Sequence, residues 1–169
     1  MHGTVRTFIQ KMSEKYPNHF DRGNRVVELG SHDINGSPRE YFKYPSEYVG
    51  IDYHGGKGVD VVGVAHEWKP AKADYDVVVS TEMLEHDPYW EKTLAHASNI
   101  LRSGGILLFT CAAPPRPAHH LHDSPEDGYY GNRSTEDVLG VLQASCDWLE
   151  IHAQYERKGL DLVFWGVKA

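Results

Sequence analysis

The sequence has few cysteines, no long apolar run and no excess of basic residues. Its two cysteines, Cys111 and Cys146, do not form a CxxC pair and have no zinc-like partners nearby, which argues against a disulfide framework or a structural metal. No stretch approaches the length of a transmembrane helix, and the amino terminus lacks the apolar run of a signal peptide. We therefore expect a cytoplasmic protein without a membrane partner.

Basic residues are outnumbered: 17 Lys and Arg stand against 24 Asp and Glu, which gives a net charge of −7. Proteins that bind nucleic acid usually carry clustered Lys and Arg, so we expect a small-molecule substrate and no nucleic-acid partner. The 169 residues, 40% of them hydrophobic, are enough for one domain with a genuine core. We expect a single domain over residues 1–169, and a homodimer is left open.

Short apolar runs alternate with turn and helix signals along most of the chain. Helices are predicted to begin at Ser37-Pro38 and at Asp87-Pro88, and the second is predicted to end in the turn at residues 102–105. Ser134 and Asp137 resemble a capping box that starts a third helix, which runs to about Ser145. Strands are predicted over residues 25–29, 47–52, 59–62, 75–80 and 106–111.

The last part of the chain alternates apolar and polar residues in two runs, 148–155 and 160–167, which predicts an antiparallel hairpin. The preceding alternation of strands and helices predicts a parallel sheet. The fold class is therefore α/β: a doubly wound, mostly parallel Rossmann-like sheet with a C-terminal antiparallel hairpin strand. In such sheets ligands bind at the carboxyl ends of the strands.

Two segments are candidates for covering a site at that edge. Residues 1–22 contain an amphipathic helix, with Val5, Phe8 and Met12 spaced for one face, which covers a site as a lid or caps the sheet. Residues 112–133 form a Pro- and His-rich loop after the last parallel strand. Because such loops lie at the ligand-binding edge, we expect this one to face the substrate.

Two acidic residues and a glycine end neighbouring predicted strands. Gly30 lets a ligand approach the backbone closely, and Glu28 offers a carboxylate to an amino group. Asp52 follows Gly30 by 22 positions (52 minus 30), close to the roughly 20-residue offset at which an acid binds ribose hydroxyls. A nucleoside-type ligand is favoured; the alternative is that both acids stabilise turns or are solvated.

Further motifs, in the right order, resemble those of small, type 11-like class I S-adenosylmethionine-dependent methyltransferases: residues 27–30, 50–52, 65–66, 75–86 and 101–105. The reversed last strand also matches that family. The resemblance implies a methyltransferase enzyme with S-adenosyl-L-methionine as its cofactor. One departure is that His32 and Ile34 occupy positions where the family usually has glycine, so we expect Asn35-Gly36 to supply the bend.

By this resemblance, Glu28 and Gly30 contact the methionine part of the cofactor and Asp52 contacts the ribose. Ala65 and His66 contact the adenine edge, and residues 80–86 form the floor of the methyl-transfer site. The implied cofactor-binding residues are Glu28, Gly30, Ser31, His32, Asp52, Tyr53, Ala65, His66, Thr81 and Glu82.

Histidines supply the candidate catalytic bases. His86 follows the predicted central strand, where an imidazole suits deprotonation of a hydroxyl or amine; alternatively it anchors the next helix. His119, in the substrate-facing loop, is the second candidate. The spacing of the loop histidines and Asp123 matches no known zinc pattern, so base or substrate contact is favoured over a metal, and none is expected. The residues expected to bind substrate, or else to pack within the loop, are His120, His122, Tyr129 and Tyr130.

The predicted function is methyl transfer from S-adenosylmethionine to an oxygen or nitrogen nucleophile of a small polar or glycosyl acceptor. Such a displacement mainly needs alignment and exclusion of water, so no catalytic triad is required. The altered glycine loop motivates an alternative, in which a binding or partner module keeps the fold without the reaction. A nicotinamide-dependent (NAD) oxidoreductase is less favoured, because a dinucleotide-binding domain does not predict the final hairpin.

Overall fold

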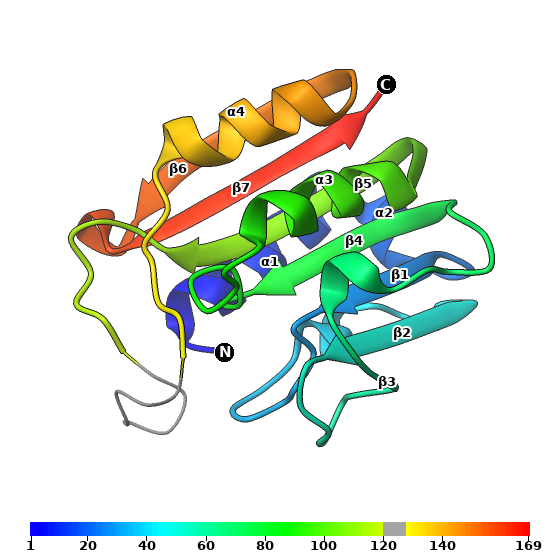
Figure 1. The fold of residues 1–169 in the computed structure, drawn as a ribbon. Coiled ribbons are helices and arrows are strands. Elements are labelled where there is room, and N and C mark those ends of the chain that lie inside the picture. The colour runs from blue at the N-terminus through cyan, green and yellow to red at the C-terminus, as the bar shows by residue number, and fades with distance from the viewer. Residues whose placement is uncertain (120–127) are drawn as a thin grey trace.

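A computed structural model describes residues 1–119 and 128–169 and contains a seven-stranded sheet (Figure 1). The strand order is β3-β2-β1-β4-β5-β7-β6, with β7 antiparallel to both of its neighbours and the other pairs parallel. This confirms the predicted Rossmann-like sheet with its reversed C-terminal hairpin. The strands are β1 (Arg25–Leu29), β2 (Glu47–Asp52), β3 (Val61–Val62), β4 (Tyr75–Thr81), β5 (Leu101–Ala112), β6 (Trp148–Glu156) and β7 (Asp161–Lys168).

Helices cover both faces of the sheet: α1 and α2 lie on one face, and α3 and α4 on the other (Figure 1). Successive residues of a strand point to opposite faces, so Val77 and Val79 pack on the α1 side and Val78 packs on the α3 side. The apolar run of β4 is therefore buried on both faces, as predicted for a central strand. The helices are α1 (Gly3–Lys15), α2 (Pro17–Phe20), α3 (Trp90–Ile100) and α4 (Thr135–Ser145), with 3-10 turns η1 (Pro38–Tyr41), η2 (Ala65–Glu67) and η3 (Arg157–Gly159).

The prediction of a helix from Ser37-Pro38 is wrong, because only the 3-10 turn η1 forms there. The Ser37 hydroxyl caps this turn by accepting a hydrogen bond from the backbone N–H of Arg39. The chain leaves the helical conformation at Phe42, whose ring stacks on that of Phe20 with centroids 4.6 Å apart. Pro45 then disfavours helix in the residue before it. The connection from β1 to β2 is therefore a short turn and an extended segment.

Among the other boundaries, the starts of β5 and α3 differ most from the prediction. β5 begins at Leu101 rather than at residue 106, so Gly105 lies within the strand instead of ending a helix. A Cβ on Gly105 would lie 2.9 Å from the carbonyl oxygen of Tyr75, so the absence of a side chain at Gly105 allows β4 and β5 to pair here. α3 begins at Trp90 rather than at Asp87, because the Asp87 carboxylate accepts the backbone N–H of residue 89 at 2.7 Å.

The signals nearer the carboxyl end are confirmed. The Ser134 hydroxyl and the Asp137 carboxylate form the reciprocal capping box that starts α4, which ends at Ser145. Strands β6 and β7 form the predicted hairpin, joined through η3. No helix in the described part of the chain is both long enough and apolar enough to cross a membrane.

Candidate active site

Gly30 lies directly after β1, at the edge where the parallel strands β1, β2 and β4 all end. Its φ of +78° is in the left-handed region that favours glycine. Its backbone N–H donates a hydrogen bond to the carbonyl oxygen of Ile51 at 2.8 Å. A Cβ at this position would lie 2.6 Å from the Cβ of Met83, in the loop after β4. Both the backbone conformation and the close approach of that loop therefore require glycine.

Asp52, the last residue of β2, ties together the loops that follow β1 and β2. Its Oδ2 accepts a hydrogen bond from the backbone N–H of His32 at 3.0 Å, and its Oδ1 accepts one from His54 at 2.9 Å. Carboxylate oxygens have two lone pairs each, so the group can still accept hydrogen bonds from ligand hydroxyls. The side chain predicted to bind ribose therefore also fixes the Gly30 loop beside it.

The loop that departs from the usual glycine pattern is accommodated by glycines on the neighbouring segment. A Cβ on Gly50 would lie 2.7 Å from the Ser31 Oγ, and one on Gly56 would lie 2.3 Å from the His32 Nε2. Because Gly50 and Gly56 have no side chains, those of Ser31 and His32 fit against them. The bend expected at Asn35-Gly36 is also present, with Gly36 at a φ of +113°.

Glu28, in β1, is buried and 2% exposed. Its carboxylate accepts hydrogen bonds from the hydroxyls of Tyr48 at 2.7 Å and Ser37 at 3.0 Å. Burial raises the pKa of Glu28 to about 7, although the hydrogen bonds from Tyr48 and Ser37 oppose the rise. The group therefore changes its protonation near neutral pH, and a cationic ligand group beside it would favour the ionised form.

The other predicted cofactor-binding residues lie in three places. Tyr53 follows β2 and is 70% exposed. Ala65 and His66 begin η2, where the His66 ring lies 5.2 Å from that of Tyr89. Thr81 ends β4.

Three of the predicted cofactor-binding residues carry a buried polar atom without a hydrogen-bond partner in the described residues: Ser31 Oγ, His32 Nδ1 and His66 Nδ1. Buried polar atoms normally have a partner in the protein, in water or in a ligand. Two of the three atoms follow β1 and the third lies in η2, after β3. Their chemistry therefore fits a polar cofactor bound along this edge of the sheet.

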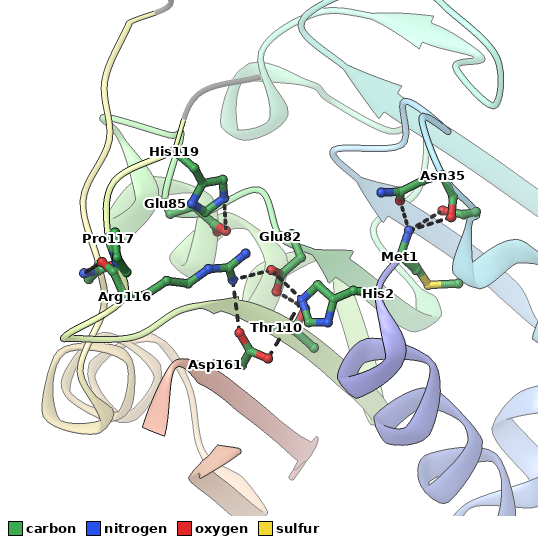
Figure 2. Close-up of polar contacts among 12 residues, drawn as sticks. Met1, His2, Asn35, Glu82, Glu85, Thr110, Arg116, Pro117, His119 and Asp161 are labelled. Atoms are coloured by element: carbon green, nitrogen blue, oxygen red, sulfur yellow. Dashed lines mark hydrogen bonds and ion pairs between the residues drawn. The ribbon is translucent and has the colours of Figure 1, made fainter. Parts of the chain in front are cut away.

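Glu82 follows β4 at a φ of +57°, which is uncommon for a residue with a side chain and is often found at functional sites. Its carboxylate accepts hydrogen bonds from Arg116 at 2.8 Å and from the Thr110 hydroxyl at 3.0 Å, and lies 3.0 Å from the Nε2 of His2 (Figure 2). Arg116 also donates to Asp161 at 3.0 Å. Burial alone would raise the pKa of Glu82, but His2 and Arg116 outweigh it and lower the pKa to about 2.

The N-terminal segment packs on the sheet and its start reaches the candidate site, while its role as a lid stays a prediction. Val5, Phe8 and Met12 of α1 pack against the sheet, in a cluster with Trp165 of β7. The residue before α1, His2, reaches Glu82 at the site. The helix therefore caps the sheet, and its first turn lies at the edge where the strands end.

Glu85 lies near the two predicted bases. Its side chain is fully buried, and neither carboxylate oxygen has a hydrogen-bond partner within residues 1–119 and 128–169. Burial and then the charge of Glu82 raise the pKa of Glu85 to about 8. The His119 Nε2 lies 4.0 Å from the Glu85 Oε1 (Figure 2), and the His119 ring is 5.3 Å from that of His86 and 4.9 Å from that of Tyr130. Both predicted bases and one predicted substrate-binding residue therefore converge.

The family comparison agrees with this geometry. A family model described as a methyltransferase domain matches residues 1–144, which include β1 to β5 and the edge just described. The chain belongs to this family. The match confirms the resemblance to class I S-adenosylmethionine-dependent methyltransferases. No curated protein matches the sequence of this methyltransferase.

Solved structures with little sequence identity share the fold of the methyltransferase. The Burkholderia thailandensis 1,6-didemethyltoxoflavin-N1-methyltransferase, bound to 1,6-didemethyltoxoflavin and S-adenosylhomocysteine, aligns with a TM-score of 0.69 and 16% identity over 98% of this chain and 78% of its own. The Haemonchus contortus phosphoethanolamine N-methyltransferase 2 aligns with a TM-score of 0.70 and 11% identity, over 96% of this chain and 53% of its own. The CurJ carbon methyltransferase aligns with a TM-score of 0.63 and 18% identity, over 98% of this chain and 54% of its own. At these identities the likeness establishes the fold alone.

The loop of the methyltransferase that is predicted to face the substrate is only partly described. His120 and His122 lie outside the described residues. The Tyr129 hydroxyl accepts a hydrogen bond from Arg133 at 3.0 Å, and the Tyr130 hydroxyl donates one to Asn132 at 2.9 Å. Both tyrosines are thus held within the loop next to β5 and α4, and their contact with substrate stays a prediction.

Several residues at the site of the methyltransferase were not predicted from the sequence. Arg116 pairs with both Glu82 and Asp161, yet Arg116 comes from the loop after β5 and Asp161 from β7. His2 comes from the opposite end of the chain. Arg116 stands between prolines in the predicted substrate-facing loop, which is the one local signal that could have drawn attention to it. The pairing itself depends on the tertiary structure.

Proposed function

We propose that this methyltransferase moves the methyl group of S-adenosylmethionine to an oxygen or nitrogen nucleophile of a small polar or glycosyl acceptor. The observation that carries the proposal is the edge where β1, β2 and β4 end, which brings Glu28, Gly30 and Asp52 to one place. A buried carboxyl, a glycine with no room for a side chain and a partly exposed carboxylate match the three parts of a charged nucleoside cofactor.

The roles follow from the chemistry of each group. Glu28 accepts the cationic amino group of the cofactor, and Gly30 leaves the backbone open to its methionine chain. Asp52 accepts the ribose hydroxyls. The Ala65–Glu67 turn, in which the His66 Nδ1 has no hydrogen-bond partner among the described residues, would hold the adenine. Ser31, His32, Tyr53, Thr81 and Glu82 complete the cofactor site.

When bound, S-adenosylmethionine supplies an electrophilic methyl group on a sulfonium that leaves as a neutral thioether. The protein therefore has to hold the acceptor in line and exclude water rather than activate a leaving group. The imidazole of His86, or that of His119, takes the proton that an oxygen or nitrogen nucleophile loses. Tyr130 lies beside both rings and is positioned to orient the acceptor.

Charge supports a small polar acceptor over an anionic polymer. The carboxylates of Glu82 and Asp161 lie at this edge, and both bind the single guanidinium of Arg116. A polyphosphate chain would meet these carboxylates, whereas nucleic-acid sites use clustered cations. A neutral hydroxyl or amine acceptor meets no such repulsion. Figure 2 shows the carboxylates around Arg116.

The two alternatives are weaker on specific grounds. The altered glycine loop motivated a binding or partner module that keeps the fold without the reaction, but Gly50 and Gly56 provide the room that Ser31 and His32 need. The position of β7 between β5 and β6, antiparallel to both, disfavours an NAD-dependent oxidoreductase.

Isothermal titration calorimetry with S-adenosylmethionine and S-adenosylhomocysteine tests the proposal. We expect saturable binding of both ligands at one site per chain. Incubation with methyl-labelled cofactor and a panel of small hydroxyl and amine compounds should then transfer label. Absence of binding heat for either ligand at several temperatures would refute the cofactor assignment, and tight binding of reduced nicotinamide instead would favour the oxidoreductase.

Substitution of Asp52 by alanine should weaken cofactor binding by about 1 to 3 kcal/mol, the range for losing hydrogen bonds to a charged group. Asp52→Asn keeps one acceptor oxygen and should lose less of the cofactor affinity than Asp52→Ala. Asp147→Ala, at an exposed residue before β6, is the matched control and should bind normally. Calorimetric affinities of the three variants provide the measurement, and equal affinities for Asp52→Ala and the control would contradict the ribose contact.

Cofactor binding should release a proton near neutral pH. The pKa of Glu28 is raised to about 7, so in the free protein this group favours folding below its unfolded pKa of 4.5, and that contribution is lost as the pH rises through 7. A cationic amino group beside Glu28 stabilises the carboxylate and lowers its pKa, which expels the proton. Binding enthalpies at pH 6.5, measured in buffers of different ionisation heat, should reveal this release.

Two comparisons isolate Glu28. At pH 9 the carboxyl is already ionised in the free protein, so the proton release through Glu28 should vanish. Glu28→Gln cannot ionise, and its binding enthalpy should become independent of the buffer at pH 6.5. If wild-type protein and Glu28→Gln release the same number of protons at pH 6.5, the amino-group contact is wrong.

A further inference from the structure

Glu85 has a buried carboxyl group, and neither of its oxygens has a hydrogen-bond partner among the described residues. Its backbone is fixed: the Glu85 carbonyl accepts the N–H of Gly131 at 2.8 Å, and Arg133 donates to the preceding carbonyl, that of Leu84, at 3.1 Å. The side chain is therefore held inside the protein, next to the negative charge of Glu82. A buried polar group normally has a partner in the protein, in water or in a ligand, and a buried charge is paired or coordinates a metal.

Two imidazoles lie beside this carboxylate. One ligand atom from each of Glu85, His86 and His119 can be chosen so that all three lie within 4.8 Å of one another. Figure 2 shows the His119 ring next to the Glu85 carboxylate. Two donors on one tetrahedral zinc ion lie about 3.4 Å apart, given bonds of about 2.0 to 2.2 Å. The 4.0 Å between the His119 Nε2 and the Glu85 Oε1 would have to close by about half an ångström, which a small side-chain rotation supplies.

We propose that Glu85, His86 and His119 form a binding site for a divalent transition-metal ion of the zinc and iron(II) class. Two imidazoles with one carboxylate are a ligand set that such ions prefer. Magnesium and calcium prefer oxygen ligands, so this set disfavours them. Three protein ligands leave coordination positions open for a small molecule. The set shares only His119 with the run of histidines that the sequence makes conspicuous.

A neighbouring group of three ligands is a poorer choice. His2, Glu82 and Asp161 also lie close together, but the Arg116 guanidinium already binds Glu82 at 2.8 Å and Asp161 at 3.0 Å. That group therefore has its cation. Glu85 has no such partner in the described residues, and the negative charge of Glu82 adds to the attraction for a cation.

The position of the ion suggests its use. Glu85 and His86 are in the loop after β4, next to the edge where methyl transfer is proposed. An ion there would bind an acceptor hydroxyl at an open position and lower its pKa, and the two histidines would then be ligands instead of the base for methyl transfer. This use rests on the proposed function, whereas binding of the ion does not. Metal titration without S-adenosylmethionine therefore separates the two.

Cobalt(II) titration of chelator-treated full-length protein tests the site, because visible absorption reports a four- or five-coordinate cobalt ion. We expect one ion per chain, displaced by zinc. Glu85→Gln and His119→Asn should each lower the affinity by at least about tenfold. Circular dichroism confirms that each variant folds, and His119, which is 36% exposed, provides the test if Glu85→Gln does not fold.

Two controls make the result specific. His152→Asn, at an exposed residue of β6, should bind cobalt as the wild type does. The double variant His120→Asn/His122→Asn should also retain the site. Lack of stoichiometric binding by the wild type would overturn the proposal. So would full affinity in His119→Asn, or loss of binding only in the His120/His122 double variant.

Discussion

Gly30→Ala is expected to destabilise the protein by about 2 to 5 kcal/mol and to abolish cofactor binding. About 1 to 2 kcal/mol comes from forcing a side chain into the left-handed region, where Gly30 has a φ of +78°. A further 1 to 3 kcal/mol, roughly, comes from collision with Met83, whose Cβ would lie 2.6 Å from the new methyl group. Because this contact involves the base of the Met83 side chain, rotation of its flexible end does not relieve it.

A matched variant separates the two contributions. Gly23 also has a positive φ, of +84°, but a Cβ there would meet no atom within 4 Å. Gly23→Ala should therefore lose only the conformational part, about 1 to 2 kcal/mol, and should bind the cofactor normally. Urea unfolding and calorimetry with S-adenosylhomocysteine provide the measurements. Equal destabilisation of the two variants would show that the loop after β4 does not press on Gly30.

Arg116→Ala should destabilise the protein by about 3 kcal/mol at pH 7, the lower end of the range for removing one partner of a buried ion pair. The guanidinium serves two carboxylates: Asp161 has a side chain 1% exposed, and that of Glu82 is 18% exposed. Without Arg116, Glu82 keeps Thr110 and His2 as its partners among residues 1–119 and 128–169. Arg116→Lys retains one positive charge, and its free energy of unfolding should fall less than that of Arg116→Ala.

The loss in Arg116→Ala should depend on pH in a defined direction. The pKa of Glu82 is lowered to about 2 in the folded protein, so its contribution to stability is present above the unfolded value of 4.5 and is lost as the pH falls towards 2. The variant lacks part of this contribution. The difference in unfolding free energy between wild type and variant should therefore be largest at pH 7 and smaller at pH 4.

Arg102→Ala is the control for this effect. Arg102 also pairs with a carboxylate, that of Asp76 at 2.7 Å, but its side chain is 44% exposed. Water screens such a pair, so its loss should cost less than about 1 kcal/mol and show little change between pH 4 and 7. Equal losses for the two arginines would contradict the buried-network interpretation.

Local sequence signals predicted the elements whose own residues determine them. The apolar run of β4 is buried on both faces, and the Ser134 capping box starts α4. The prediction of a helix from Ser37-Pro38 was wrong because the start signal is present but the following residues do not continue as a helix. Phe42 turns instead to stack on Phe20, a residue of α2 that is distant in sequence. A capping signal cannot report such a contact.

The sequence by itself determined the fold class, a mostly parallel sheet with a reversed final hairpin, and the meeting of Glu28, Gly30 and Asp52 at one edge of that sheet. It could do so because residues that end neighbouring parallel strands must meet at one edge. Only the tertiary structure decided how that edge is neutralised, since Arg116 meets Glu82 through contacts between segments far apart in the chain. Packing also decided where the missing glycines are replaced: Gly50 and Gly56 leave the space that Ser31 and His32 fill.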